Sequence, residues 1–146
     1  MTLDPAATYR RTQVLTGSRL DQVVLLYQGA IRQGMLHLSA LESRDSQAAH
    51  RASIKCQEIV AALQESLDMS AGPIAAQLDQ LYRFVLDRLM DGNITKDPRP
   101  TTEALQVLRD LLPAWQAIAQ QPGHEPAGAP VGPRPVAAGA VPAGLR

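Results

Sequence analysis

The 146-residue sequence has few aromatic residues, one cysteine and no excess of either charge. Phe, Trp and Tyr make up 3% of the chain, although apolar residues make up 45%. A hydrophobic core must therefore be built from Leu, Ile, Val and Ala, and this palette favours helices over sheets. The single cysteine, Cys56, cannot form an internal disulfide, which is typical of a reducing compartment.

Two further absences exclude classes of partner. Fourteen Lys and Arg balance 14 Asp and Glu, whereas a nucleic-acid binder normally carries a basic excess that neutralises phosphates. No apolar run approaches the roughly 18 residues that cross a bilayer, and the N-terminus lacks the basic and apolar regions of a secretory signal. We therefore expect a cytoplasmic protein that binds no nucleic acid and does not insert into a membrane.

The sequence also lacks the motifs that catalysis and metal binding need. None of the histidines, His37, His50 and His124, follows an acidic residue by three positions, so the Glu-x-x-His pairs of di-iron bundles are absent. No His-Glu-x-x-His, Cys-x-x-Cys, phosphate-loop or Gly-x-Ser-x-Gly motif occurs. Cys56 falls among the predicted core residues, where a thiol is usually inert. The prediction is a protein that is not an enzyme and binds no metal or other cofactor.

What the sequence does contain is four segments of helical periodicity, separated by polar or Pro- and Gly-containing breaks. We predict helices over about residues 19–42, 46–68, 73–95 and 102–120. Asp45 or Ser46 is a candidate N-cap of the second helix, and Pro73 suits the first turn of the third. Thr101 or Thr102 is expected to open the fourth. Helices of this length with short loops predict an all-α fold, an antiparallel up-down four-helix bundle.

The predicted bundle covers residues 18–120, and the composition differs on either side of it. Residues 1–17 are polar with isolated apolar side chains, and we expect a mobile N-terminal segment that can pack on the bundle. Residues 121–146 contain six Pro, five Gly and six Ala. Such a tail cannot bury enough apolar surface to offset the entropy of ordering, so it is predicted to be disordered.

Three of the helices carry more apolar surface than one core stripe needs. The stripe of the second helix holds Ala49, Ala52, Cys56, Ile59, Val60, Leu63 and Leu67. Ile54 lies roughly opposite this stripe, near Ala61. Leu25 and Leu36 point away from the stripe of the first helix, and the third has an apolar arc about 140° wide. Single exposed aliphatic residues are common, but this set indicates a groove for an amphipathic helix of a partner. The candidate groove residues are Leu25, Tyr27, Ile54, Ala61, Leu78, Tyr82, Leu86 and Leu89.

A series of short segments also follows a recognisable order along the chain. These segments are Tyr9-x-x-x-x-Val14, Leu26-Tyr27-Gln28-Gly29-Ala30, Ile54-Lys55-Cys56-Gln57-Glu58-Ile59-Val60, Leu63-Gln64-Glu65-Ser66-Leu67-Asp68-Met69, Ile74-Ala75, Leu78, Leu81-Tyr82, Arg88-Leu89, Asn93, Leu105, Leu108-Arg109 and Ala114-Trp115. In this order and spacing, residues 5–119 resemble the flagellar secretion chaperone family FliS.

The resemblance implies a four-helix bundle that uses no nucleotide or metal. It implies that the protein holds the C-terminal segment of flagellin in the cytoplasm, prevents premature polymerisation and presents flagellin to the flagellar type III export gate. In such families the N-terminal segment can lie on the groove as a cap that the cargo displaces. Tyr9 and Val14 are the residues that match this segment.

Two departures from the family pattern bear on local structure. Gly92 stands before Asn93 where Ala is more usual, and it should loosen the end of the third helix. Pro113 lies inside the fourth helix, where it removes a backbone hydrogen bond to the Arg109 carbonyl and should kink the helix.

Three other functions remain open from the sequence. An interaction protein of the same bundle class would use the same groove to bind a flagellar regulator such as an anti-sigma factor. An enzyme or metal-binding bundle would need clustered His and Glu, which the sequence lacks. A structural bundle without cargo would make the off-stripe aliphatic residues incidental.

Overall fold

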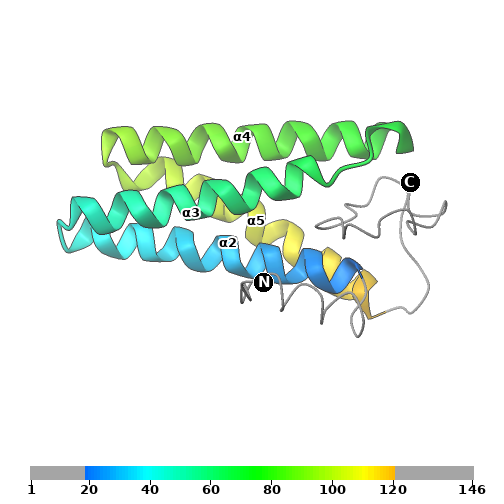
Figure 1. Cartoon of the computed structure of the whole chain (residues 1–146), viewed down its shortest axis with the longest axis horizontal. Helices are drawn as coiled ribbons and strands as arrows, with labels where there is room; N and C mark the ends of the chain where they lie inside the picture. Colours follow the sequence, from blue (N-terminus) through cyan, green and yellow to red (C-terminus); the bar gives the residue numbers. More distant parts are fainter. Residues whose placement is uncertain (1–18, 121–146) are drawn as a thin grey trace, which may run out of the picture.

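The computed structural model describes residues 19–120, which form a four-helix bundle (Figure 1). The helices are α2 (Arg19–Glu42), α3 (Ser46–Glu65), α4 (Pro73–Thr95) and α5 (Pro98–Ala119), with a short 3-10 helix η1 (Met69–Ala71) before α4. Each long helix packs against two others in the ring α2–α3–α4–α5–α2. The prediction of an all-α four-helix bundle is confirmed. The predictions for residues 1–17 and 121–146 fall outside the described residues and stay predictions.

The helix boundaries follow from capping residues that the sequence carries. Asp45 is the N-cap of α3, and its carboxylate accepts a hydrogen bond of 3.0 Å from the Ala48 amide. Pro73 is the first residue of α4. At this position a backbone amide makes no hydrogen bond within the helix, so proline, which lacks an amide hydrogen, is tolerated. α2 and α4 therefore have the predicted bounds, whereas α3 ends at Glu65, a little before the predicted residue 68.

The predicted start of the fourth helix was wrong, because α5 begins at Pro98 and not near residue 101. Pro98 and Pro100 both lie in the first turn, where amide hydrogens make no bond within the helix and proline is tolerated. Asp97 is the N-cap, and its carboxylate accepts a hydrogen bond of 2.9 Å from the Arg99 amide. Pro113 lies inside α5 as predicted.

The core consists mainly of aliphatic side chains with three aromatic rings among them. Tyr27, Tyr82 and Trp115 are each at most 5% exposed. The centroid of the Tyr27 ring lies 6.3 Å from that of Tyr82 and 6.4 Å from that of Trp115. The two tyrosine hydroxyls share a hydrogen bond of 2.7 Å, and burial raises the pKa of both. The predicted core stripe of the second helix is confirmed, since five of its residues are buried within α3, Leu67 is buried just after it, and Ile59 packs partly buried against the core.

Two glycines allow close contact between neighbouring helices. A Cβ atom at Gly34 of α2 would overlap the Leu105 side chain of α5. A Cβ atom at Gly92 of α4 would overlap the Thr101 hydroxyl of α5. We expected Gly92 to loosen the end of its helix, but α4 continues to Thr95, and Gly92 is the point where α5 packs against it.

Candidate partner-binding surface

Four of the predicted groove residues lie inside the bundle. Tyr27, Leu78, Tyr82 and Leu89 are 6% exposed or less. A partner does not reach them in this arrangement, and the structure gives them a packing role. The wide apolar arc of α4 has a simple cause, since α4 packs against both α3 and α5 and must bury a side toward each.

Ile54 and Ala61 of α3 and Leu86 of α4 are half-buried, and these two helices pack along one seam. Hydrogen bonds of 2.9 Å cross this seam at two places and join Gln64 with Asp79 and His50 with Asn93. Ile54 lies one turn after His50 on α3, and Leu86 lies midway between Asp79 and Asn93 on α4. Residues at such spacings share one side of a helix. Leu86 therefore lies on the side of α4 that faces this seam, and Ile54 lies near the side of α3 that bears His50.

The remaining predicted residues lie apart from this seam. Leu25 is half-buried on α2, whose neighbours in the ring of helices are α3 and α5. Tyr9 and Val14 lie outside the described residues.

An apolar hollow of about 490 Å³ lies between α2 and α5. It is lined by Gln28, Ile31, Arg32, Met35, Leu36, Ser39 and Leu112. Met35 and Leu36 are each 51% exposed, while Ile31 and Leu112 pack partly buried against the core. Exposed aliphatic side chains around a concave surface are typical of a groove that takes an apolar helix.

Sequence reasoning missed most of this hollow. Of the residues that line the hollow, only Leu36 had been singled out from the sequence. A signal was present on the first helix, because Ile31, Met35 and Leu38 follow the i, i+4, i+7 spacing beside the core stripe. Nothing in the sequence paired this row with Leu112, since the two belong to separate helices.

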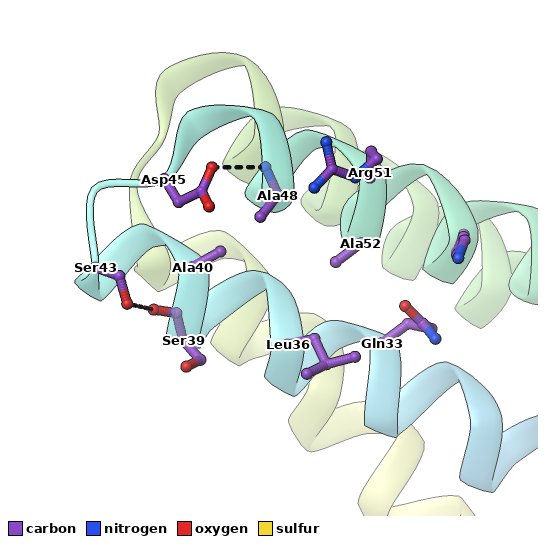
Figure 2. A pocket seen from close by; sticks show the side chains of 10 residues that line it. Gln33, Leu36, Ser39, Ala40, Ser43, Asp45, Ala48, Arg51 and Ala52 are labelled. Atoms are coloured by element: carbon purple, nitrogen blue, oxygen red, sulfur yellow. Dashed lines mark hydrogen bonds between the residues drawn. The ribbon is translucent and has the colours of Figure 1, made fainter.

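A second hollow of about 380 Å³ lies between α2 and α3, near the loop that joins them (Figure 2). Ala52 of α3 points toward Leu36 of α2 across this hollow, and Arg51 lies beside Ala52 on α3 (Figure 2). Its lining also includes Gln33, Ser39, Ala40, Ser43, Asp45, Ala48 and Lys55. Leu36 and Ser39 of α2 line both hollows. The two hollows therefore lie on either side of these two residues.

Two features of the titratable side chains within residues 19–120 bear on reactivity, namely the spacing of metal-ligand residue types and the burial of Cys56. No three His, Cys, Asp or Glu side chains gather there as a metal-ion site would require. Cys56 is buried as predicted, and its thiol donates a hydrogen bond of 3.2 Å to the Ala30 carbonyl. Burial raises the pKa of the Cys56 thiol to about 12, so it stays protonated and unreactive near neutral pH. Within the same residues, no helix is long and apolar enough to span a bilayer.

The class of protein follows from this bundle together with a family match. The model of the family described as flagellar protein FliS matches residues 2–122, so the chain belongs to the FliS family of flagellar secretion chaperones. Two relatives carry the name flagellar secretion chaperone FliS. The chain is 28% identical to the Vibrio cholerae protein over 108 residues, which cover 73% of this chain and 79% of the relative. It is 25% identical to the Bacillus subtilis protein over 117 residues, or 80% and 87% of the two chains. The resemblance inferred from the order of short segments is confirmed.

Proposed function

We propose that the chain is a cytoplasmic export chaperone that binds the C-terminal segment of flagellin, prevents its premature polymerisation and delivers it to the flagellar type III secretion apparatus. Membership of the FliS family supports the class of function. The observation that carries the binding mode is the apolar hollow between α2 and α5, whose Met35 and Leu36 side chains are half exposed.

The hollow suits a segment that becomes helical on binding. An apolar helix face laid against Ile31, Met35 and Leu112 is withdrawn from contact with other flagellin molecules, so it no longer promotes polymerisation. Met35 has a flexible, polarisable side chain that adapts to the shape of a partner. Ordering a disordered segment consumes part of the interaction energy, which keeps release at the export apparatus feasible.

The seam between α3 and α4 is a second part of the proposed contact surface. Ile54, Ala61 and Leu86 lie on it, and Leu25 adds a half-buried aliphatic side chain on α2. A segment that folds on binding can cover several seams of a small bundle. Tyr9 and Val14 complete the proposal as part of an N-terminal segment that caps the surface until cargo displaces it.

The proposed function is tested by titrating the flagellin C-terminal segment into the protein in a calorimeter. Met35→Asp removes an apolar contact and adds a carboxylate that the complex must desolvate. Burial of such a side chain contributes about 1.5–3 kcal/mol, so the variant should bind at least about tenfold more weakly. Met69→Asp is the matched control, because Met69 is 53% exposed but lies in η1, away from both hollows.

The control should bind within about twofold of the wild type, and circular dichroism should show the same helical content for all three proteins. No binding by the wild-type protein would show that the proposed function is wrong. Normal binding by Met35→Asp would show that flagellin uses another surface.

A further inference from the structure

The cations that line the two hollows beside α2 differ in their ion pairing from several arginines elsewhere on the bundle. On α4 and at the start of α5, the arginines are in ion pairs: Arg83 with Asp79, Arg88 with Asp91 and Glu103, and Arg99 with Asp97. The cations that line the two hollows beside α2 are Arg32, Arg51 and Lys55. Within residues 19–120 none of these three forms an ion pair. The charge on this side of the bundle is therefore open to a partner.

The groove between α2 and α3 concentrates two of these charges on one wall. Arg51 and Lys55 are four residues apart on α3, which places them about 6 Å apart along the helix axis. The opposite wall carries the exposed Leu36 of α2 (Figure 2). The one carboxylate in the lining, that of Asp45, is engaged as the cap of α3 and accepts a hydrogen bond from the Ala48 amide.

The floor of the groove is made of small side chains. Ala40 and Ala52 are 9% and 7% exposed, so they lie at the bottom of the hollow between the two walls. A floor of alanines allows the backbone of a bound helix to come close, while Leu36 offers an apolar contact beside it. The groove thus combines an apolar floor with a wall of two cations one turn apart.

The segments that flank the bundle in the sequence carry little negative charge that could fill this groove. Residues 1–18 contain a single acidic residue, Asp4, and residues 121–146 contain only Glu125. A partner segment that is richer in carboxylates than residues 1–18 and 121–146 therefore complements the charge of this groove better. Charge complementarity of this kind increases the rate of encounter and selects the correct partner.

We infer that the groove between α2 and α3 holds an acidic amphipathic helix of the flagellin segment, with two carboxylates one turn apart on Arg51 and Lys55. Its apolar side chains contact Leu36 and the alanine floor. This inference rests on the proposed function and adds a charge requirement to it. Leu36 and Ser39 of α2 line both the groove and the apolar hollow, so one segment that crosses α2 there can contact both.

The test compares Arg51→Glu/Lys55→Glu with the wild type in binding the flagellin C-terminal segment at low and high salt. At low salt the double variant should bind at least about tenfold more weakly. The wild-type affinity should fall as salt screens the charges, and the variant should lose most of this dependence. Arg83→Glu/Arg99→Glu is the matched control, because it makes the same change in net charge at arginines that are 71% and 87% exposed and lie away from both hollows.

A charge swap makes the test specific to the groove. Flagellin segments in which acidic residues are changed to Lys should bind the double variant more tightly than they bind the wild type. Equal affinity and equal salt dependence of wild type and double variant would overturn this inference and leave the proposed function standing. Absence of any binding by the wild type would overturn both. A salt-sensitive dimer of the free protein that the double variant abolishes would place a second copy in the groove and overturn the inference as well.

Discussion

His37 is the residue whose charge state is most tightly coupled to the packing of the bundle. It is fully buried, its Nδ1 lies 2.8 Å from the Ala49 carbonyl, and its Nε2 has no hydrogen-bond partner. With Nδ1 protonated and donating to the carbonyl, the neutral imidazole is satisfied on one side. Adding a second proton would place an unpaired charge inside the protein. Burial therefore lowers the pKa of His37, and the positive charge of Lys96 lowers it further by a smaller amount.

The first prediction is that acidification destabilises the bundle through His37. An unfolded histidine takes up a proton near pH 6.5, whereas the folded His37 does so only at lower pH. The unfolded state then binds more protons, so the contribution to stability is complete above about pH 6.5 and is lost as pH falls toward the folded pKa. The free energy of unfolding should fall by up to about 1.4 kcal/mol per pH unit in this window.

The measurement is urea unfolding at several pH values between about 7.5 and 5. His37→Gln should flatten the slope below pH 6.5, since Gln retains a hydrogen-bond donor but does not titrate. Asp79 and Asp97 do not confound this window, because hydrogen bonds lower the pKa of both carboxyls from 3.8. An unchanged slope in His37→Gln would show that other groups cause the acid sensitivity.

At the scale of helices, the contact between α4 and α5 depends on Gly92. A Cβ atom there would overlap the Thr101 hydroxyl and lie 3.3 Å from the Asp97 carbonyl oxygen. Gly29 on α2 provides the contrast, because a Cβ atom at that position would meet only the Ile59 side chain at an ordinary 3.5 Å. The same substitution should therefore have opposite effects in these two helices.

The second prediction compares Gly92→Ala with Gly29→Ala by denaturant unfolding. Gly92→Ala should destabilise the bundle by about 1–3 kcal/mol, because overpacking outweighs the higher helix propensity of alanine. Gly29→Ala should be neutral or should stabilise the protein by up to about 1 kcal/mol. Adding Thr101→Ala to Gly92→Ala removes the overlapping hydroxyl and should recover part of the loss. A neutral Gly92→Ala would mean that α5 can shift away from α4 at little cost.

At the scale of the whole molecule, the surfaces available to a partner lie on three seams of the ring of helices. The apolar hollow lies between α5 and α2, and the groove that bears Arg51 and Lys55 lies between α2 and α3. The seam with Ile54 lies between α3 and α4. These seams are consecutive around the bundle, so a long cargo segment can contact them in turn.

The third prediction concerns the seam between α3 and α4, which bound flagellin would cover in addition to the two hollows. Ile54 is only half-buried, so Ile54→Asp should change stability by well under the 2–5 kcal/mol typical of truncating a buried aliphatic side chain. If flagellin covers this seam, the variant should bind flagellin at least about tenfold more weakly. The complex would lose the apolar burial of Ile54 and would also have to desolvate a carboxylate.

Cys56→Asp is the control for the position of Ile54 on α3. Cys56 lies two residues further along and is fully buried, so a carboxylate there should unfold or severely destabilise the protein. Thermal unfolding and calorimetry with the flagellin segment measure both effects. Normal binding by Ile54→Asp would remove this seam from the contact surface, and unfolding of Ile54→Asp would show that Ile54 supports the core.

The sequence by itself determined the properties that depend on near neighbours along the chain. Apolar periodicity, the Asp45 cap and Pro73 located the first three helices, and the same periodicity placed Cys56 in the core. The ordered short segments identified the family. These features could be predicted because the apolar face of a helix and its capping residue depend only on residues a few positions apart in the sequence. The start of α5 was predicted too late, although it also depends on near neighbours. Pro98 and Pro100 are compatible both with the first turn of a helix and with a segment that separates two helices, and the sequence does not distinguish the two.

Only the tertiary structure decided which apolar side chains remain available to a partner. The arc of α4 appeared too wide for one core stripe, yet Leu78, Tyr82 and Leu89 are buried because two neighbouring helices cover it. The hollow beside α2 exists because Met35 and Leu112, far apart in the sequence, come together where α2 meets α5. Periodicity gives the direction of a side chain relative to its own helix axis, whereas burial depends on which helices pack around that axis.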